Sequence, residues 1–162
     1  MPKPRRGIGA SHALVVAAGL FGAAGVVAAA AASHVTAASH LVTAGHGMAA
    51  GQPGNELLRT AALFLMLHAA ALVGVAGIAW RAAEPWPAAT ARPTVAAWPG
   101  RVFGLIGLAM AAGVLLFAGD LASRALLGGR LFPGAAPIGD SLLIASWLSL
   151  ALAGLLAGRS GG

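Results

Sequence analysis

Residues 61–80 read AALFLMLHAAALVGVAGIAW and contain a single ionisable side chain, His68. An α-helix rises about 1.5 Å per residue, so a helix over this stretch is about 30 Å long, the thickness of the hydrocarbon core of a bilayer. Three further apolar runs, at residues 14–32, 102–118 and 138–157, have similar lengths. The pattern therefore predicts four membrane-crossing helices.

The composition of the whole chain also favours a membrane environment. Of its 162 residues, 59% are hydrophobic and 9% are charged, and the mean hydropathy is +0.85. Soluble domains carry about 25% charged residues, and a water-soluble fold could not cover its surface with so few charges. We expect one all-α domain over residues 1–162, a four-helix transmembrane bundle. The apolar runs place its helices near residues 10–33, 57–80, 101–125 and 138–158.

The positions of the basic residues indicate how the bundle is oriented. Seven of them flank the side that holds both termini: Lys3, Arg5, Arg6, Arg81, Arg92, Arg101 and Arg159. Three lie on the other side: Arg59, Arg124 and Arg130. The positive-inside rule then predicts cytoplasmic N- and C-termini in a bacterial-type inner membrane. The net charge of +6 is spread over helix ends and does not form one basic face, so we expect no nucleic-acid partner.

The first apolar run has a second interpretation. A basic segment before it and the small residues Ala30, Ala31 and Ala32 at its end resemble a cleavable signal peptide, and Arg5-Arg6 resembles a twin-arginine signal. However, the run of 19 apolar residues is longer than the apolar h-region of 7–15 residues that is typical of a signal peptide. Its length favours a retained membrane helix.

Residue types needed for common chemistry are missing from the sequence. There is no cysteine, which excludes disulfides, thiolate nucleophiles and cysteine-based metal sites. There is also no P-loop, dinucleotide-binding fingerprint or HExxH motif, and no set of nucleophile, base and acid. His34, His40 and His46 are six residues apart, so on a helix they point about 120° apart, which is poor geometry for one metal site. We expect no enzymatic activity, no metal and no cofactor.

A few polar residues within or beside the apolar runs are candidates for a functional site. His68 is expected near the middle of the bilayer, where a polar side chain is costly and usually faces the bundle interior. It could relay a proton, bind haem or bind a quinone, and a hydrogen bond between helices is the structural alternative. Asp120 and Arg124 are spaced i,i+4 and predict an ion pair. Asp140 is expected at the start of the fourth helix, where a carboxylate is favourable. Together with His34, these residues could form a polar vestibule at the outer end.

Glycine is frequent within the predicted helices. We expect helix packing at Gly22, Gly74, Gly107, Gly154 and Gly158. In lipid, small residues let two helix backbones approach closely, and this close packing takes the place of the hydrophobic effect. A genome biased towards alanine and glycine codons explains the same composition.

Three short motifs in the second half of the chain resemble a known family. They are Phe117-Ala118-Gly119-Asp120-Leu121, Ala136-Pro137-Ile138-Gly139-Asp140 and Ser146-Trp147. They resemble the YgdD-like family of small four-helix membrane proteins, whose histidine positions are matched by His68 and His34. The chain departs from the family pattern at Leu65, Asp120 and Asp140, where the family has Gln, Ser and Gly. The resemblance implies the four-helix topology of a divergent member and no established activity.

These observations favour a protein without catalytic activity. The leading hypothesis is a small membrane scaffold or accessory subunit that packs against other membrane-protein subunits within the lipid bilayer. The alternative is a transporter of a small solute or proton that uses His68 and the outer-end acids. A third possibility is a protein that binds haem or a quinone.

Overall fold

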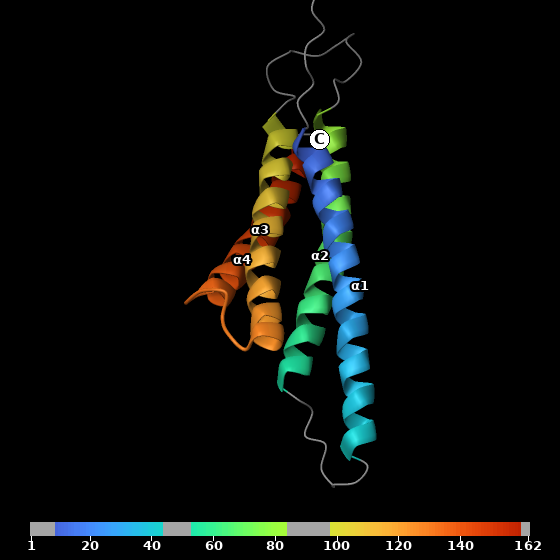
Figure 1. Cartoon of the computed structure of the whole chain (residues 1–162). Helices are drawn as coiled ribbons and strands as arrows, with labels where there is room; N and C mark the ends of the chain where they lie inside the picture. Colours follow the sequence, from blue (N-terminus) through green and yellow to red (C-terminus); the bar gives the residue numbers. More distant parts are fainter. Residues whose placement is uncertain (1–8, 44–52, 84–97, 160–162) are drawn as a thin grey trace, which may run out of the picture.

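The computed structural model describes residues 9–43, 53–83 and 98–159 of the chain. Within these ranges the protein consists of four helices and contains no strand. The helices are α1 (Ala10–Thr43), α2 (Pro53–Ala83), α3 (Trp98–Leu127) and α4 (Ala135–Arg159) (Figure 1). The all-helical class and the number of helices agree with the sequence prediction.

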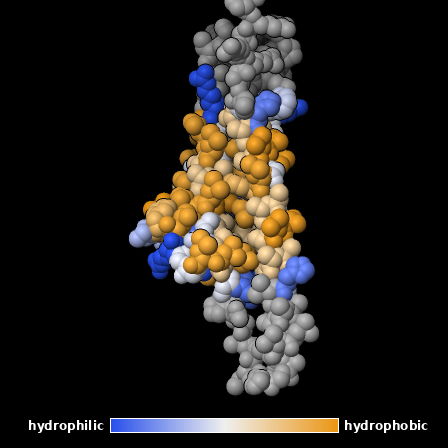
Figure 2. All heavy atoms as spheres, viewed as in Figure 1, coloured by the Kyte–Doolittle hydropathy of each residue, from blue (hydrophilic) through white to orange (hydrophobic). Residues whose placement is uncertain are grey.

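Each helix contains a segment that is long and apolar enough to cross a membrane. Large apolar side chains cover the outside of the protein, and Leu20, Leu63, Leu105 and Leu148 are 64–67% exposed. Figure 2 shows the apolar residues as a broad central band, with hydrophilic residues towards both ends. Soluble proteins rarely expose such a large contiguous apolar surface. The protein therefore has the structure of a multi-pass membrane protein.

Successive helices run in opposite directions. In Figure 1, α1 and α3 descend while α2 and α4 ascend, so the first and last described residues lie at the same end of the molecule. We call this the terminal end, and we call the opposite end, where α3 turns into α4, the turn end. The apolar runs explain this up-and-down order, because none of the connecting segments contains an apolar run long enough to form a further membrane-crossing helix.

The first three helices form the packed centre of the molecule. They contact one another, whereas the backbone of α4 comes close to α3 alone within the described part of the chain. Leu14, Leu72, Met110 and Val114 are fully buried where α1, α2 and α3 meet. Leu143 of α4 is a buried member of the same core, and the partly buried side chains of Ala136 and Leu150 pack against it. The protein is therefore a three-helix core with α4 attached to α3, rather than a closed ring of four equivalent helices.

Glycine permits the closest helix contacts. A Cβ atom on Gly139 of α4 would lie 2.6 Å from the backbone nitrogen of Phe117 and 2.8 Å from the carbonyl oxygen of Gly113, both on α3. A Cβ atom on Gly107 would lie 2.5 Å from a methyl carbon of Leu14 on α1. No other residue fits at Gly139 without moving α4, because the atoms that it would meet belong to the backbone of α3.

The helices extend beyond the ends expected from the apolar runs. The largest difference is in α1, which continues to Thr43 instead of ending near residue 33. An apolar run marks only the part of a helix that lies in hydrocarbon, and a polar residue next to it is no reason for the helix to stop. Prolines mark the starts better, because Pro53, Pro99 and Pro137 all lie in the first turn of a helix, where proline is tolerated.

A seven-residue turn, 128–134, connects α3 to α4. Gly128 directly follows α3 with a φ of 72°, and Gly134 directly precedes α4 with a φ of 92°. Both lie in the left-handed region that glycine adopts without steric cost, and glycine commonly ends helices in this way. The turn reverses the direction of the chain within seven residues, so that α4 packs beside α3.

Candidate functional site

His68 lies on the buried face of α2 and is 3% exposed. Its Nδ1 lies 2.8 Å from the carbonyl oxygen of Phe64, one turn earlier in the same helix. Its Nε2 lies 3.4 Å from the indole Nε1 of Trp147 on α4. The imidazole therefore connects α2 to a helix whose backbone does not approach α2 in the described part of the chain.

The two partners of His68 determine which nitrogen carries the proton. A carbonyl oxygen only accepts hydrogen bonds, so Nδ1 must donate to Phe64. An indole N–H only donates, so Nε2 must accept from Trp147. The arrangement thus assigns the Nδ1–H tautomer to His68, and both of its nitrogens are engaged within the protein.

Aromatic rings surround the imidazole on several sides. The ring of Phe64 stacks on His68 with centroids 5.6 Å apart, and Trp147 meets it edge-on with centroids 6.1 Å apart. Phe117 of α3 packs against Phe64 with centroids 4.4 Å apart. The neighbouring polar residue, Ser146, is also buried, but its hydroxyl donates to the carbonyl of Leu142 in its own helix. The cluster therefore ties α2, α3 and α4 together.

This geometry favours a structural role for His68 over the functional roles considered from sequence. A haem ligand needs a free lone pair on one nitrogen, and the lone pair of Nε2 already accepts from the indole. A proton relay needs a nitrogen that can exchange partners, and both nitrogens of His68 are hydrogen-bonded within the chain. The interhelical hydrogen bond is the interpretation that fits the observed contacts.

Asp120 forms a second buried polar cluster at the turn end. It is completely buried near the end of α3, and Arg124, one turn later, donates to its Oδ2, as the i,i+4 spacing predicts. Its Oδ1 accepts a hydrogen bond from the backbone N–H of Leu131, at 2.9 Å. The carboxylate therefore fastens the α3–α4 turn to α3, a role that the sequence did not reveal because Leu131 contributes only its backbone.

In the described part of the chain, the remaining residues of the expected polar vestibule are not bonded to Asp120. Asp140 and His34 are both exposed, and no hydrogen bond or ion pair joins either residue to Asp120 within the described ranges. Asp140 also lies beyond the first turn of α4, because the helix begins three residues earlier than expected. No group of three or more potential metal ligands occurs among the described residues. The side chains of His40 and His46 lie outside them.

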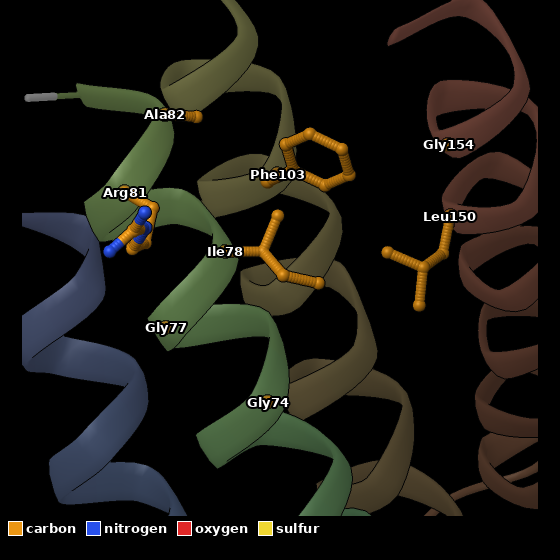
Figure 3. Close-up of a pocket in the computed structure, with 8 residues that line it drawn as sticks. All are labelled: Gly74, Gly77, Ile78, Arg81, Ala82, Phe103, Leu150 and Gly154. Carbon is orange, nitrogen blue, oxygen red and sulfur yellow. The ribbon is translucent and has the colours of Figure 1, made fainter. Parts of the chain in front are cut away.

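The glycines expected at helix contacts fall into two groups. Gly22 and Gly107 face neighbouring helices, with a side-chain atom of another helix within 3.8 Å of an added Cβ. Gly74 and Gly154 instead have no atom within 4 Å of an added Cβ, because they line an open groove between α2 and α4 (Figure 3). These two therefore pack against none of the helices in the part of the chain that the structure describes. The surroundings of Gly158 lie outside the described residues.

Sequence reasoning missed two residues that matter here. Trp147 is the hydrogen-bond partner of His68, and Gly139 permits the close contact between α3 and α4. In the sequence analysis, Trp147 and Gly139 each occur only as members of a family motif. The motif that contains Pro137 and Gly139 was the available signal for the contact between α3 and α4. A glycine in a membrane helix lets a second helix approach its backbone closely.

Comparison with known proteins identifies a family but no activity. The family described as Protein of unknown function (DUF423) matches residues 28–140. This range includes His68 and Asp120 but not Trp147 or most of α4. No curated protein and no solved structure matches the chain. Because the match covers more than half of the sequence, the chain belongs to the DUF423 family.

Proposed function

We propose that the protein is a non-catalytic membrane scaffold or accessory subunit that packs against other membrane proteins. The supporting observation concerns the three buried polar side chains of the described residues, His68, Asp120 and Ser146. All three form hydrogen bonds within the chain: His68 with Trp147 of α4, Asp120 with the α3–α4 turn, and Ser146 with the carbonyl oxygen of Leu142 in its own helix. Groups that perform chemistry direct a lone pair or a proton at a ligand. Here the polar atoms of the buried side chains bond to other groups of the chain. The lipid-facing surface of the helices therefore remains as the part of the molecule that can bind a partner.

We place the partner on the outer face of α1. Within the membrane segments of α1 and α4, 22% and 17% of residues are buried, compared with 39% in α2, so most of the surface of α1, like that of α4, remains open. A Cβ atom at Gly19 would meet nothing within 4 Å, and Ala23, one turn later, is exposed. Small residues four positions apart allow a second helix to approach the backbone closely, which is how membrane helices associate.

The test compares two substitutions on the lipid-facing side of α1. Gly19→Leu should obstruct a close helix contact, whereas Val26→Leu should not, because position 26 already carries a large exposed side chain. The full chain is purified from its own membrane in mild detergent, and associated subunits are quantified by mass spectrometry. We expect a partner at fixed stoichiometry with the wild type and Val26→Leu, and its loss with Gly19→Leu. A wild type that purifies without any stoichiometric subunit would overturn the proposal.

Transport of a small solute or proton is the competing hypothesis, and the contacts of His68 give it less support. Reconstitution into liposomes separates the two. The scaffold proposal predicts a flux no greater than that of empty liposomes. A flux that disappears in His68→Ala would instead establish transport and remove the basis of the scaffold proposal. An absorbance spectrum with a Soret band would likewise establish haem binding.

We further propose that the terminal end is cytoplasmic, in a bacterial-type inner membrane, and that the chain is a YgdD-like member of its family. The excess of basic residues at the terminal end supports the orientation. Because the chain has no cysteine, a single introduced cysteine reports its own side of the membrane. A membrane-impermeant maleimide on intact cells should label Gly129→Cys and not Ser160→Cys. The reverse pattern would contradict the orientation.

A further inference from the structure

A groove of about 830 Å³ opens between α2 and α4, in the half of the protein nearer the terminal end. Figure 3 shows the side chains of Ile78 on α2 and Leu150 on α4 on either side of the gap, with Phe103 of α3 between these helices. Arg81 borders the groove at the end of α2, and Figure 3 shows its side chain directed away from Leu150, towards α1. The groove exists because α4 packs on α3 and leaves α2 uncovered on this side.

We propose that this groove binds one phospholipid with an anionic headgroup. An acyl chain lies along α2 between Ile78 and Leu150, and the exposed side chain of Arg81 turns towards the mouth of the groove, where its guanidinium binds the headgroup phosphate. This binding site is independent of the partner surface on α1, so either proposal can fail without the other.

The walls of the groove are suited to a hydrocarbon chain. Gly74 and Gly77 on α2 and Gly154 on α4 have no atom within 4 Å of an added Cβ, so the groove reaches the helix backbones there. Its volume is within the range of about 300–1,000 Å³ that is typical of ligand-binding pockets. From Gly74 to Arg81 the groove follows about 10 Å of helix axis, which lies within one leaflet. A flexible chain can fill such a space, and lipid is the only solvent available to it.

The charge at the mouth of the groove selects the headgroup. Arg81 is exposed and forms no ion pair within the described part of the chain. The carboxylates of the described residues, Glu56, Asp120 and Asp140, all belong to the turn-end halves of their helices. An arginine there can bind a phosphate through paired N–H donors, and one basic residue near the surface adds about fivefold to the affinity for an anionic lipid.

The hydrogen bond between His68 and Trp147 argues for a lipid chain over a partner helix in this groove. It joins α2 to α4 about 9 Å below Gly74 along α2. A transmembrane helix of a partner would need an opening along the whole depth of about 30 Å and a width of about 10 Å. A groove closed at the level of His68 cannot provide this depth, whereas an acyl chain can end there.

The experiment measures lipid binding by the full-length protein. Delipidated protein in detergent is titrated with phosphatidylglycerol or phosphatidylcholine carrying the same acyl chains, and bound lipid is counted by native mass spectrometry. We expect the wild type to bind phosphatidylglycerol about fivefold more tightly than phosphatidylcholine. Arg81→Gln should abolish this preference. Arg101→Gln, which removes an exposed charge at the same end but outside the groove, should retain it.

A second variant tests the groove itself. Gly154→Leu should fill the space beside Leu150 and reduce the binding of both lipids, with circular dichroism as the check on helix content. Because Arg81 is exposed, Arg81→Gln remains interpretable even if Gly154→Leu misfolds. Equal binding of the two lipids by the wild type, or an unchanged preference in Arg81→Gln, would overturn the proposal. So would a protein subunit that Gly154→Leu displaces while lipid binding is unaffected, since the occupant would then be a helix.

Discussion

At the scale of single residues, hydrogen bonding decides what the buried polar side chains do. His68 and Asp120 are nearly or fully buried, and each is paired within the protein. The pair of Asp120 and Arg124 could be predicted because both lie on one helix at a spacing that brings side chains together. The bond between His68 and Trp147 could not, because the residues are 79 positions apart and meet only through the placement of α4 on α3.

Trp147→Phe should lower the free energy of unfolding by about 0.6 kcal/mol, the average value of a hydrogen bond between membrane helices, and by no more than about 1.7 kcal/mol. The substitution keeps an aromatic ring but removes the indole N–H, so Nε2 of His68 loses its donor. Unfolding is followed in detergent micelles. The same substitution in a His68→Leu background is the control, and it should then cost clearly less. Equal costs in both backgrounds would show that the hydrogen bond contributes nothing to stability.

Arg124→Gln should destabilise the protein more than Asp120→Asn. Removing the cation leaves a carboxylate that is 0% exposed without its counter-charge, whereas removing the anion leaves an arginine side chain that is 30% exposed and reaches solvent or headgroups. Breaking a buried ion pair costs about 3–5 kcal/mol, and partial exposure of Arg124 places Asp120→Asn below that range. Thermal denaturation of the two variants in one detergent measures the order. A larger loss for Asp120→Asn would contradict this account.

At the scale of helices, the sequence predicted that each helix exists better than it predicted where the helix ends or which helix it contacts. Each apolar run became a helix, because length and hydropathy are sufficient for a membrane span. The end of α1 was wrong by about ten residues, since the alanine-rich segment beyond residue 33 contains neither proline nor glycine to stop it. Glycine content alone could not separate Gly107, which meets Leu14, from Gly154, which faces the groove, because both have the same local sequence character.

Gly139→Ala should destabilise the protein, and Gly154→Ala should not. A methyl group at position 139 would lie 2.6 Å from a backbone nitrogen of α3, so α4 must move, at a cost of about 1–3 kcal/mol. At position 154 of the same helix the methyl meets nothing within 4 Å. There alanine is neutral or stabilising by up to about 1 kcal/mol through its higher helix propensity. Denaturation of both variants under identical conditions measures the difference, and similar stabilities would show that α3 and α4 do not cross closely at Gly139.

At the scale of the whole molecule, the four-helix topology followed from the sequence, but the arrangement of the helices did not. In a soluble bundle the hydrophobic face of each helix indicates which side is buried. In lipid the outer face is as apolar as the inner one, as the exposure of Leu63, Leu105 and Leu148 shows, so this signal is lost. The peripheral position of α4, and therefore the groove beside α2, depends on small-residue contacts and one long-range hydrogen bond.

The peripheral position of α4 predicts that it opens before the three-helix core. Only 17% of the residues in its membrane segment are buried, compared with 50% in α3, and its backbone approaches a single neighbour within the described residues. Regions with few buried contacts open at lower free energy than the core of a protein. Hydrogen exchange measured by mass spectrometry, at increasing denaturant in micelles, should show α4 losing protection first. Trp147→Phe should increase the difference in protection between α4 and α2, because it removes the hydrogen bond that joins these two helices. Loss of protection in all four helices at one denaturant concentration would show instead that α4 belongs to the same cooperative unit as the core.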